Sequence, residues 1–453
     1  MSGGSPFRLE TRRLVALAWP VAIAQAATML MGFVDLVMVG RLGGGALASI
    51  GLANPWIFGT MFFAIGLMSG IDPVVTQAHG AGDGARAARA LQRGVVIALA
   101  MSVPLLWLWT QTSEFLVLFG QDPELAAAAE SYVVAQLWSI PFFLVNAALR
   151  QYLQGRELVR PAMWVVAIAN VFNILFNWVL IFGNLGFPAL GLEGAGIATA
   201  LTRVLSFFLL LAFVAGFRLH VDAWVPWSRE VLRGAGFRQI LALGIPIAFQ
   251  TSLEMWAFNA SNLIAGTLGA NQLAGHVVVM HMASFSFMFV LGISQATTVR
   301  VGNLIGAARP EDAQRSAWVG ILLGGTVMAV FAAVFVVGRR IIPTAYTNDA
   351  AVIAMAISIV PMAAAFQIFD GIQNACCGVL RGMGRPLPAV IANTVGYWVI
   401  ALPLGYWLAR ETEWGLRGLW FALTIGLVIV AIGLLLWIRR RGPASVQALG
   451  AVD

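Results

Sequence analysis

The sequence predicts an all-α polytopic membrane protein, in which twelve transmembrane helices form two six-helix lobes related by a pseudo-two-fold axis along the membrane normal. Composition is the first indication: of 453 residues, 60% are hydrophobic and 10% are charged, and the mean hydropathy is +0.86. Soluble globular proteins of this length do not have such a composition. The second indication is a series of long apolar stretches, and the third is an internal repeat of the whole pattern.

Apolar runs between turn and charge clusters mark the twelve expected spans. Each is roughly 20 residues or more, which at about 1.5 Å per residue crosses a hydrocarbon core of about 30 Å. The first run is too long for the apolar part of a signal peptide, so we expect it to be retained as the first span. The expected spans are residues 14–39, 47–71, 92–112, 125–148, 160–183, 191–217, 239–266, 273–299, 314–337, 350–377, 387–409 and 415–438.

The basic residues indicate the orientation of these spans. All 27 are arginines, and the absence of lysine excludes a Walker A phosphate loop and a Schiff-base cofactor. Most of the arginines lie in the amino-terminal segment and in alternate loops, so the positive-inside rule predicts that both termini are cytoplasmic. We expect a multi-pass protein of the cell inner membrane. The net charge of +7 is therefore a topology signal, and we expect no nucleic-acid partner.

The two halves of the chain repeat each other at a shift of about 225 residues. Because each repeat holds six spans, both halves start on the cytoplasmic side. We expect an N-terminal lobe at 1–220, a cytoplasmic connection at 221–238, a C-terminal lobe at 239–438 and a cytoplasmic tail at 439–453. Channels can also be built from repeats, but two lobes around one cleft favour a carrier. The matches are Pro20–Gln25 with Pro246–Gln250, Leu42–Ala48 with Leu268–Ala274, Ile168–Asn170 with Ile391–Asn393, and Gly191–Gly194 with Gly415–Gly418.

Three carboxylates lie inside apolar spans: Asp35 in the first, Glu254 in the seventh and Asp370 in the tenth. An ionised carboxylate at such depth costs on the order of 2.5–3.5 kcal/mol, so it should face the bundle interior, bind a cation or be protonated. Low dielectric favours the neutral carboxyl and a bound cation favours the charged one, so ion binding and protonation compete there. These groups are candidates for coupling an ion to transport. The alternative is a structural carboxylate, with Asp35 pairing with Arg203 of the sixth span.

Neutral oxygen ligands accompany the carboxylates. Asn170, Asn173 and Asn177 in the fifth span are spaced three and four apart, which puts them on one helix face, and Thr199 lies in the sixth span. Carboxylate, amide and hydroxyl oxygens are ligands of hard cations, although the asparagines could equally serve interhelical hydrogen bonding. The four histidines have no metal-site spacing, so we expect no metal other than a Na+ at the coupling residues. In the second lobe, Asn259, Ser261 and Asn262 lie near Glu254, and Gln367, Gln373 and Asn374 flank Asp370.

Several motifs along nearly the whole chain resemble those of the MATE (multidrug and toxic compound extrusion) transporters, and most closely the NorM-like branch. This resemblance implies a twelve-helix antiporter whose two lobes form a V-shaped cavity and which exports organic cations against entry of Na+ or H+. The motifs are Trp19-Pro20, Val34–Gly40 followed by Leu47-Ala48, Ala270–Ala274, Arg300–Gly306, and Phe369–Gln373 leading to Gly378–Gly382.

The resemblance also implies roles for particular residues. In NorM-type members an acidic pair in the second lobe binds the coupling cation, and Glu254 and Asp370 occupy those places. DinF-type relatives build a first-lobe cation site from an aspartate, which corresponds to Asp35, together with fifth-span polar residues and a sixth-span threonine. Asn173, Asn177 and Thr199 match these candidate ligands. Where those relatives can carry a second aspartate this chain has Asn177, so one negative charge is missing and protonation of Asp35 is an equal option.

We therefore predict a secondary active multidrug efflux antiporter that works as a monomer without a cofactor and exchanges amphipathic, mostly cationic organic compounds for Na+ or H+. One alternative is a lipid or lipid-linked saccharide flippase of related architecture, which should show a more cationic cavity. Another is an integral membrane enzyme. The chain has no histidine or cysteine metal cluster, no nucleophile motif and no lysine, so we expect that it is not an enzyme.

Overall fold

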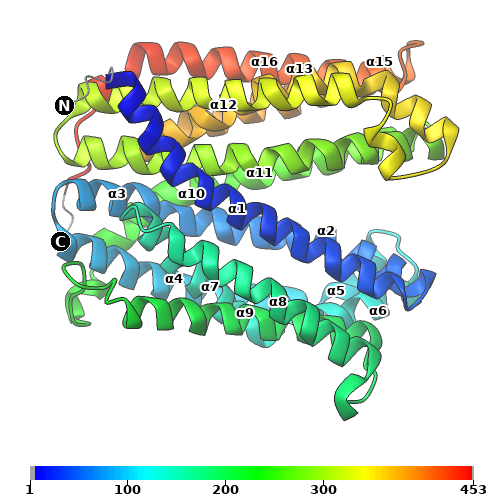
Figure 1. The fold of residues 1–453 in the computed structure, drawn as a ribbon, viewed down its shortest axis with the longest axis horizontal. Helices are drawn as coiled ribbons and strands as arrows, with labels where there is room; N and C mark the ends of the chain where they lie inside the picture. The colour runs from blue at the N-terminus through cyan, green and yellow to red at the C-terminus, as the bar shows by residue number, and fades with distance from the viewer. Residues whose placement is uncertain (1–5, 451–453) are drawn as a thin grey trace. The chain divides into compact units, whose positions relative to one another are not determined.

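The structure, a computed structural model, describes residues 6–450, and within that range every regular element is a helix (Figure 1). Twelve helical segments are long and apolar enough to cross a membrane. The predicted fold class, an all-α polytopic membrane protein with twelve transmembrane helices, is therefore confirmed. The elements up to residue 216 are α1 (Pro6–Gly40), α2 (Gly44–Met68), η1 (Ser69–Ile71), α3 (Asp72–Gly80), α4 (Gly84–Trp109), α5 (Thr112–Leu118), α6 (Pro123–Val134), η2 (Leu137–Ser139), α7 (Ile140–Gly155), α8 (Arg160–Phe182), η3 (Asn184–Gly186) and α9 (Gly191–Gly216).

The second half of the chain repeats this pattern of long helices with short connections. Its elements are η4 (Arg229–Leu232), α10 (Gly234–Gly266), α11 (Ala270–Gly306), α12 (Pro310–Gly338), η5 (Ile342–Ala345), α13 (Ala350–Gly382), α14 (Leu387–Asn393), η6 (Thr394–Ala401), α15 (Leu402–Arg410), α16 (Leu416–Arg441) and η7 (Pro443–Ser445).

The contacts within the chain divide it into two compact units. The N-terminal unit contains Ala24–Val75 and Asp83–Ala248, and the C-terminal unit contains the chain up to Ile23, Thr76–Gly82 and Phe249–Gly450. Within the C-terminal unit, α1 begins and α16 ends at the same end of the helices (Figure 1), as expected for an even number of spans. The lobe boundaries expected at 220 and 239 stay a prediction.

Several helices continue beyond the apolar runs that mark the spans. The second predicted span stops at residue 71, before Asp72 and Pro73, but the helical path continues through η1 into α3 as far as Gly80. Pro73 lies in the first turn of α3, where the fixed φ of proline suits the start of a helix. Hydropathy marks the part of a helix within the membrane, and the hydrogen-bond ladder continues into the polar region beyond it.

Local sequence signals explain the helix ends. Asp122 caps α6, and its carboxylate accepts hydrogen bonds from the backbone N–H groups of Glu124 and Leu125 at 2.9 and 3.2 Å. Such a cap contributes about 1 kcal/mol. The carboxyl end of a different helix, α8, is followed by Gly183. The φ of Gly183 is +75°, the left-handed conformation that glycine adopts without strain.

The fourth and eleventh spans are irregular at their centres. The fourth is broken between α6 and α7, where Pro141 in the first turn of α7 has no N–H to continue the ladder. The side chain of Gln136 then donates to the carbonyl of Tyr132 at 3.0 Å and satisfies an acceptor at the break. The eleventh span contains a π-helix, η6, between α14 and α15. Discontinuous helices and π-helical turns are frequent at binding sites of transporters and other proteins.

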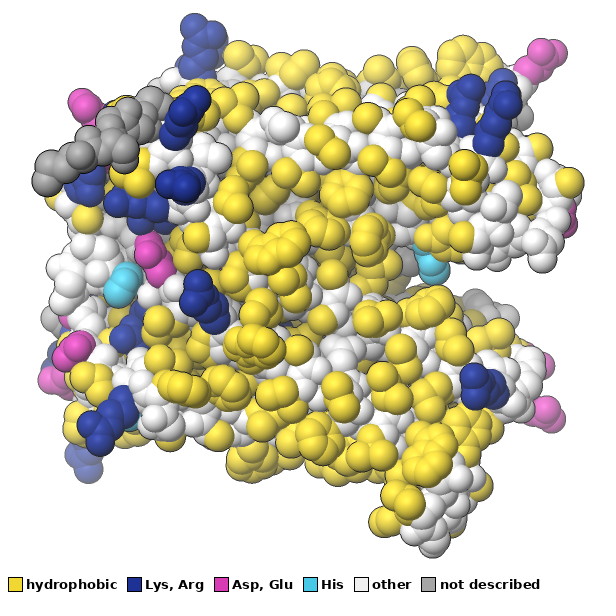
Figure 2. All heavy atoms as spheres, viewed as in Figure 1, with side chains coloured by type: hydrophobic (Ala, Val, Ile, Leu, Met, Phe, Trp, Pro, Cys, Tyr) yellow, Lys and Arg dark blue, Asp and Glu magenta, His cyan; other side chains and the backbone are white. Residues whose placement is uncertain are grey.

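Close backbone contact also shapes the C-terminal unit. Gly371 on α13 packs against Gly324 on α12 so closely that a Cβ at Gly371 would lie 2.5 Å from the carbonyl oxygen of Gly324. Small residues at such crossings let transmembrane helices approach closely. In both units, hydrophobic side chains cover the middle of the helices and most charged ones lie near the helix ends (Figure 2). Asp35, Glu254 and Asp370 are exceptions, because all three are buried.

Candidate functional site

The N-terminal unit brings Asp35 together with the polar residues predicted to accompany it. Asn177 of α8 donates from Nδ2 to Oδ1 of Asp35 at 2.5 Å, and Thr199 of α9 donates to Oδ2 at 3.4 Å. Asn177 also donates to Oδ1 of Asn173, one turn earlier on the same helix, at 3.2 Å. We call these four residues the Asp35 cluster. The three-four spacing of the fifth span thus places Asn173 and Asn177, both buried, on the face that meets α1 and α9.

The Asp35 cluster has spare hydrogen-bonding capacity. Within residues 6–450, Oδ1 of Asn177 and Nδ2 of Asn173 are buried without a hydrogen-bond partner. Burial removes the water that would hydrate an amide oxygen. When no hydrogen bond replaces that water, the burial costs about 1–3 kcal/mol. Beside a carboxylate, it is the kind of oxygen that a hard cation accepts as a ligand. The donor set of this cluster therefore fits a cation such as Na+.

The structural alternative, an ion pair between Asp35 and Arg203, is not formed in the part of the chain that the structure describes. Arg203 instead donates to the hydroxyl of Ser139 at 3.4 Å, and its guanidinium lies over the ring of Phe143 at 5.2 Å. Its charge still acts on Asp35 and on the buried Tyr132. Arg203 is thus a neighbour of the cluster and not its salt-bridge partner.

In the C-terminal unit, a chain of amide side chains connects the two predicted carboxylates. Asn374 donates to Oδ1 of Asp370 at 2.9 Å and to Oε1 of Gln373 at 2.7 Å. Gln373 in turn donates to Oδ1 of Asn393 at 3.1 Å, and Asn393 donates to Oε2 of Glu254 at 3.3 Å. Asp370 also experiences the charge of Glu254. We call these five residues the Glu254–Asp370 cluster.

Three helices converge on this cluster. Glu254 comes from α10, Asp370 from α13 and Asn393 from the end of α14. The indole of Trp398, in the π-helix η6, donates to the carbonyl of Leu253 at 3.0 Å and connects η6 to α10 beside Glu254. The irregular eleventh span therefore helps to position the site.

Three oxygens near Glu254 have no hydrogen-bond partner in the described chain: Oε1 of Glu254 itself, Oε1 of Gln250 and the hydroxyl of Tyr397. Gln250 lies one turn before Glu254 on the same face of α10, and Tyr397 lies in η6, where it experiences the charges of Glu254 and Asp370. Carboxylate, amide and phenol oxygens together fit a hard monovalent cation. Arg381, in the last turn of α13, is a cationic neighbour whose charge acts on Glu254.

Sequence reasoning did not select Gln250, Asn393 and Tyr397 as site residues. A signal was present for two of them, because Gln250 and Asn393 each close a repeat match, with Gln25 and Asn170 respectively. Tyr397 had no such signal, because a π-helix has no hydropathy pattern of its own. Conversely, Asn259, Ser261 and Asn262 follow Glu254 in sequence, but the hydrogen bonds of Glu254 and Asp370 within residues 6–450 do not include them.

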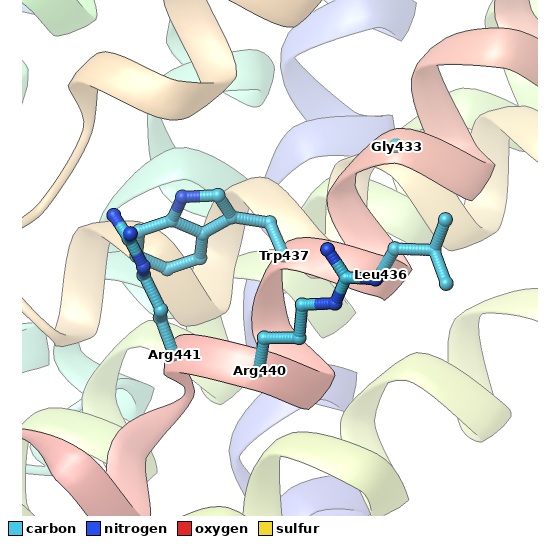
Figure 3. Close-up of a pocket in the computed structure, with 5 residues that line it drawn as sticks. All are labelled: Gly433, Leu436, Trp437, Arg440 and Arg441. Carbon is cyan, nitrogen blue, oxygen red and sulfur yellow. The ribbon is translucent and has the colours of Figure 1, made fainter.

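Other candidate features do not form a site. Among the described residues, no group of three histidine, cysteine or acidic side chains could hold a metal ion. His276 is buried in a packing role, with Nδ1 accepting from the indole of Trp420 at 3.0 Å. A surface hollow near the end of α16 lies among side chains of that helix alone (Figure 3), so it is no transport cavity. It is lined by Gly433, Leu436, Trp437, Arg440 and Arg441.

Comparison with known proteins agrees with this fold. The family model MatE matches residues 20–179 and 246–407. The probable multidrug resistance protein NorM of Mesorhizobium japonicum is 35% identical over 459 residues, covering 98% of this chain and 97% of that protein. The multidrug resistance protein NorM of Vibrio vulnificus (strain YJ016) is 33% identical over 446 residues, covering 96% of this chain and 97% of that protein.

Solved structures share the fold over the whole chain. The eukaryotic MATE transporter AtDTX14 superposes with a TM-score of 0.89 at 24% identity, covering 97% of this chain and 98% of that one. An outward-facing multidrug resistance MATE family transporter of the MOP superfamily gives 0.87 at 22% identity, covering 98% and 99%. The family resemblance inferred from the motifs is thereby confirmed. The chain belongs to the MATE (multidrug and toxic compound extrusion) transporter family and to its NorM-like branch.

Proposed function

We propose that this protein is a secondary active multidrug efflux antiporter, which exports amphipathic, mostly cationic organic compounds in exchange for Na+ or H+ by alternating access. The single observation that supports this most is the Glu254–Asp370 cluster, in which two buried carboxyl groups share one amide network beside partnerless oxygens. A purely structural carboxylate in a membrane is expected to have its oxygens satisfied. A carboxylate that exchanges an ion needs free lone pairs.

The coupling residues in this proposal are Glu254, Asp370 and Asp35, with Asn173, Asn177 and Thr199 as further ligands in the N-terminal unit. Gln250 and Tyr397 offer two additional neutral oxygens next to Glu254. The ion is a transported substrate, so the site must bind it on one side of the membrane and release it on the other. Neutral ligands that are only partly hydrogen-bonded favour such reversible binding, because they can form hydrogen bonds with their neighbours again when the ion leaves.

Exchange follows if the ion and the drug favour different conformations. A ligand shifts an equilibrium between inward-open and outward-open states only by its differential affinity for them. In our proposal, cation occupancy at the carboxylates favours one state and drug occupancy favours the other. If both cannot be bound at once, downhill entry of the cation drives uphill export of the drug.

The setting of this activity is the cell inner membrane. Apolar helices, together with the names of the NorM relatives, support a multi-pass protein that exports drugs. We place both termini on the cytoplasmic side, on the basis of the arginine distribution. We expect the monomer to be the working form, because each proposed ion site is built within one chain.

The experiment that tests this function uses the wild-type chain in proteoliposomes. A fluorescent organic cation is present at equal concentration inside and outside, and an inward gradient of Na+ or of H+ is imposed separately from outside. The proposal predicts that at least one gradient drives the probe outward against its own concentration gradient, and that an ionophore for that ion abolishes the effect. If neither gradient drives the probe while a lipid-scrambling assay is positive, the protein is a flippase and the proposal is wrong.

A further inference from the structure

Arg203 is a charged residue in the N-terminal unit whose position the proposed exchange does not explain. It lies in α9, within a transmembrane span, and is partly buried. Its guanidinium donates to Ser139 at 3.4 Å and lies 5.2 Å from the centre of the Phe143 ring. A cation inside a transmembrane segment costs about 2.5–3.5 kcal/mol on insertion scales, so an arginine there normally has a function or a partner.

Within residues 6–450, no carboxylate lies within ion-pair distance of Arg203. A hydroxyl and an aromatic face stabilise the guanidinium, but neither supplies a full negative charge. Asp35 is an acidic group whose charge acts on Arg203. Thr199, whose hydroxyl is 3.4 Å from Oδ2 of Asp35, lies one helical turn before Arg203 on the same face of α9. The two charges are therefore neighbours that interact without touching.

When the neighbouring arginine is counted with each cluster, the formal charges of the two clusters differ. The Asp35 cluster holds one carboxylate, and with Arg203 its formal charge is zero when Asp35 is ionised. The Glu254–Asp370 cluster holds two carboxylates, and with Arg381 its formal charge is −1 when both are ionised. A monovalent cation would neutralise the second cluster. The same ion would give the first cluster a net positive charge inside a low-dielectric region, which is unfavourable.

We propose that Arg203 is a fixed internal counter-cation of Asp35, which weakens the binding of Na+ to the Asp35 cluster. This inference rests on the proposed function for the identity of the coupling residues. It makes Arg203 a residue that sets the cation affinity of the Asp35 cluster, although it contacts no ion itself. The oxygens of Asn177 and Asp35 suit a cation by their chemistry, and the neighbouring charge opposes it.

Arginine suits this role better than other residues. A guanidinium remains protonated under all physiological conditions, so its charge does not depend on the state of its neighbours. It is attached to α9, so it cannot leave the cluster as a free ion does. Replacing it by glutamine keeps a long polar side chain that can still donate to Ser139, but removes the charge. Replacing it by lysine keeps the charge and loses the planar donor geometry.

The test measures Na+ binding to the purified full-length chain by scintillation proximity with radioactive Na+. The background is the Glu254→Gln/Asp370→Asn variant, in which the second cluster carries no carboxylate. We expect this background to bind no Na+ at concentrations that saturate the wild type. Adding Arg203→Gln should create Na+ binding at least about tenfold tighter than in the background. That binding should disappear again when Asp35→Asn is added.

Two controls separate charge from structure. Arg203→Lys, which keeps the charge, should leave the background without Na+ binding. Arg410→Gln is the matched control, because Arg410 also lies over an aromatic ring, that of Tyr406 at 5.4 Å, but is exposed at the end of α15. It should have no effect on Na+ binding. Thermal unfolding with and without Na+ gives a second readout, since a ligand that binds the folded state raises its stability.

The inference is overturned if the background with Arg203 intact already binds Na+ in a manner that Asp35→Asn abolishes. It is also overturned if a folded Arg203→Gln variant changes Na+ affinity less than about twofold. These outcomes leave the proposed antiport untouched, because they concern only which cluster takes the ion. Failure of the antiport itself would appear separately, as the absence of gradient-driven export by the wild type.

Discussion

Asn177 donates a 2.5 Å hydrogen bond to the carboxylate of Asp35 from a position 142 residues away in sequence. Position 177 thus carries a neutral amide. A carboxylate at the same position would add a second negative charge to the Asp35 cluster. An asparagine here satisfies Asp35 while adding no requirement for a cation. The side chain at position 177 is therefore a sensitive probe of ion binding in the N-terminal unit.

Asn177→Asp should convert the Asp35 cluster into one that needs a cation. Two carboxylates side by side repel each other unless a proton or a cation lies between them. We expect the thermal stability of this variant to fall in Na+-free buffer and to rise with Na+ concentration, at constant ionic strength set with a bulky organic cation. Asn170→Asp is the control on the same helix, since Asn170 bonds to the carbonyl of Val166 and not to Asp35. An Asn177→Asp variant with no added Na+ dependence would contradict the prediction.

Tyr397→Phe should weaken binding of the coupling ion without destabilising the fold. The phenol hydroxyl is buried without a hydrogen-bond partner within the described residues, so its removal leaves no other group unsatisfied. If it is a ligand of the ion, the KM for the coupling cation should rise about three- to tenfold, with unfolding temperature unchanged or higher. Tyr406→Phe is the matched control, because the hydroxyl of Tyr406 accepts from Arg410 outside the site.

Asn393→Leu should both destabilise the protein and disconnect the two carboxylates. Asn393 accepts from Gln373 and donates to Glu254, so its loss removes the bond to Oε2 of Glu254 and leaves Gln373 with a weak bond to the sulfur of Cys377, at about 1–3 kcal/mol for each lost bond. We expect a lower unfolding temperature and a loss of exchange. Asn393→Asp should restore the bond from Gln373 but not the bond to Glu254. Full exchange activity in Asn393→Leu would show that the amide chain has no part in coupling.

The ion pair between Glu10 of α1 and Arg300 of α11 should contribute far more to stability than a surface pair. Both side chains are largely buried, and Arg300 donates to both carboxylate oxygens at 3.0 and 3.1 Å. Removing one partner of a buried pair costs up to about 3–5 kcal/mol, because the other charge stays buried. Glu10 would be left with a longer contact to the more exposed Arg13, at 3.8 Å. Arg300→Gln should therefore lower the unfolding temperature strongly. Arg309→Gln, which breaks a more exposed pair with Asp312, should cost under about 1 kcal/mol. Equal effects of the two substitutions would contradict this.

Much of the fold could be predicted from the sequence, because membrane spans are set by length and apolarity. All twelve predicted spans coincide with helices, and their ends differ mainly where a helix extends past the apolar run. The extension through Asp72 and Pro73 to Gly80 could not be read from hydropathy, because polar residues at a helix end still complete its hydrogen bonds. The π-helix at Thr394–Ala401 has no hydropathy pattern of its own, so it could not be predicted from the sequence either.

The candidate site could be predicted in part. The spacing of Asn173 and Asn177 gave one helix face from sequence alone, but the identity of the helix opposite that face depends on tertiary packing. The link to Asp35 and Thr199 came from the family resemblance, and the structure brings these four residues together. Gln250, Asn393 and Tyr397 were missed because single polar residues in apolar spans look alike until packing shows which have partners.

The central claim is that the buried carboxylates of the Glu254–Asp370 cluster couple ion entry to drug export. Its most direct test is drug/cation exchange in proteoliposomes by the Glu254→Gln/Asp370→Asn variant, compared with wild type and with Glu413→Gln, which changes an exposed loop carboxylate in the same way. The account predicts that the double variant folds normally but has lost gradient-driven exchange, while Glu413→Gln exchanges at the wild-type rate. Wild-type exchange by a correctly folded double variant would contradict the account.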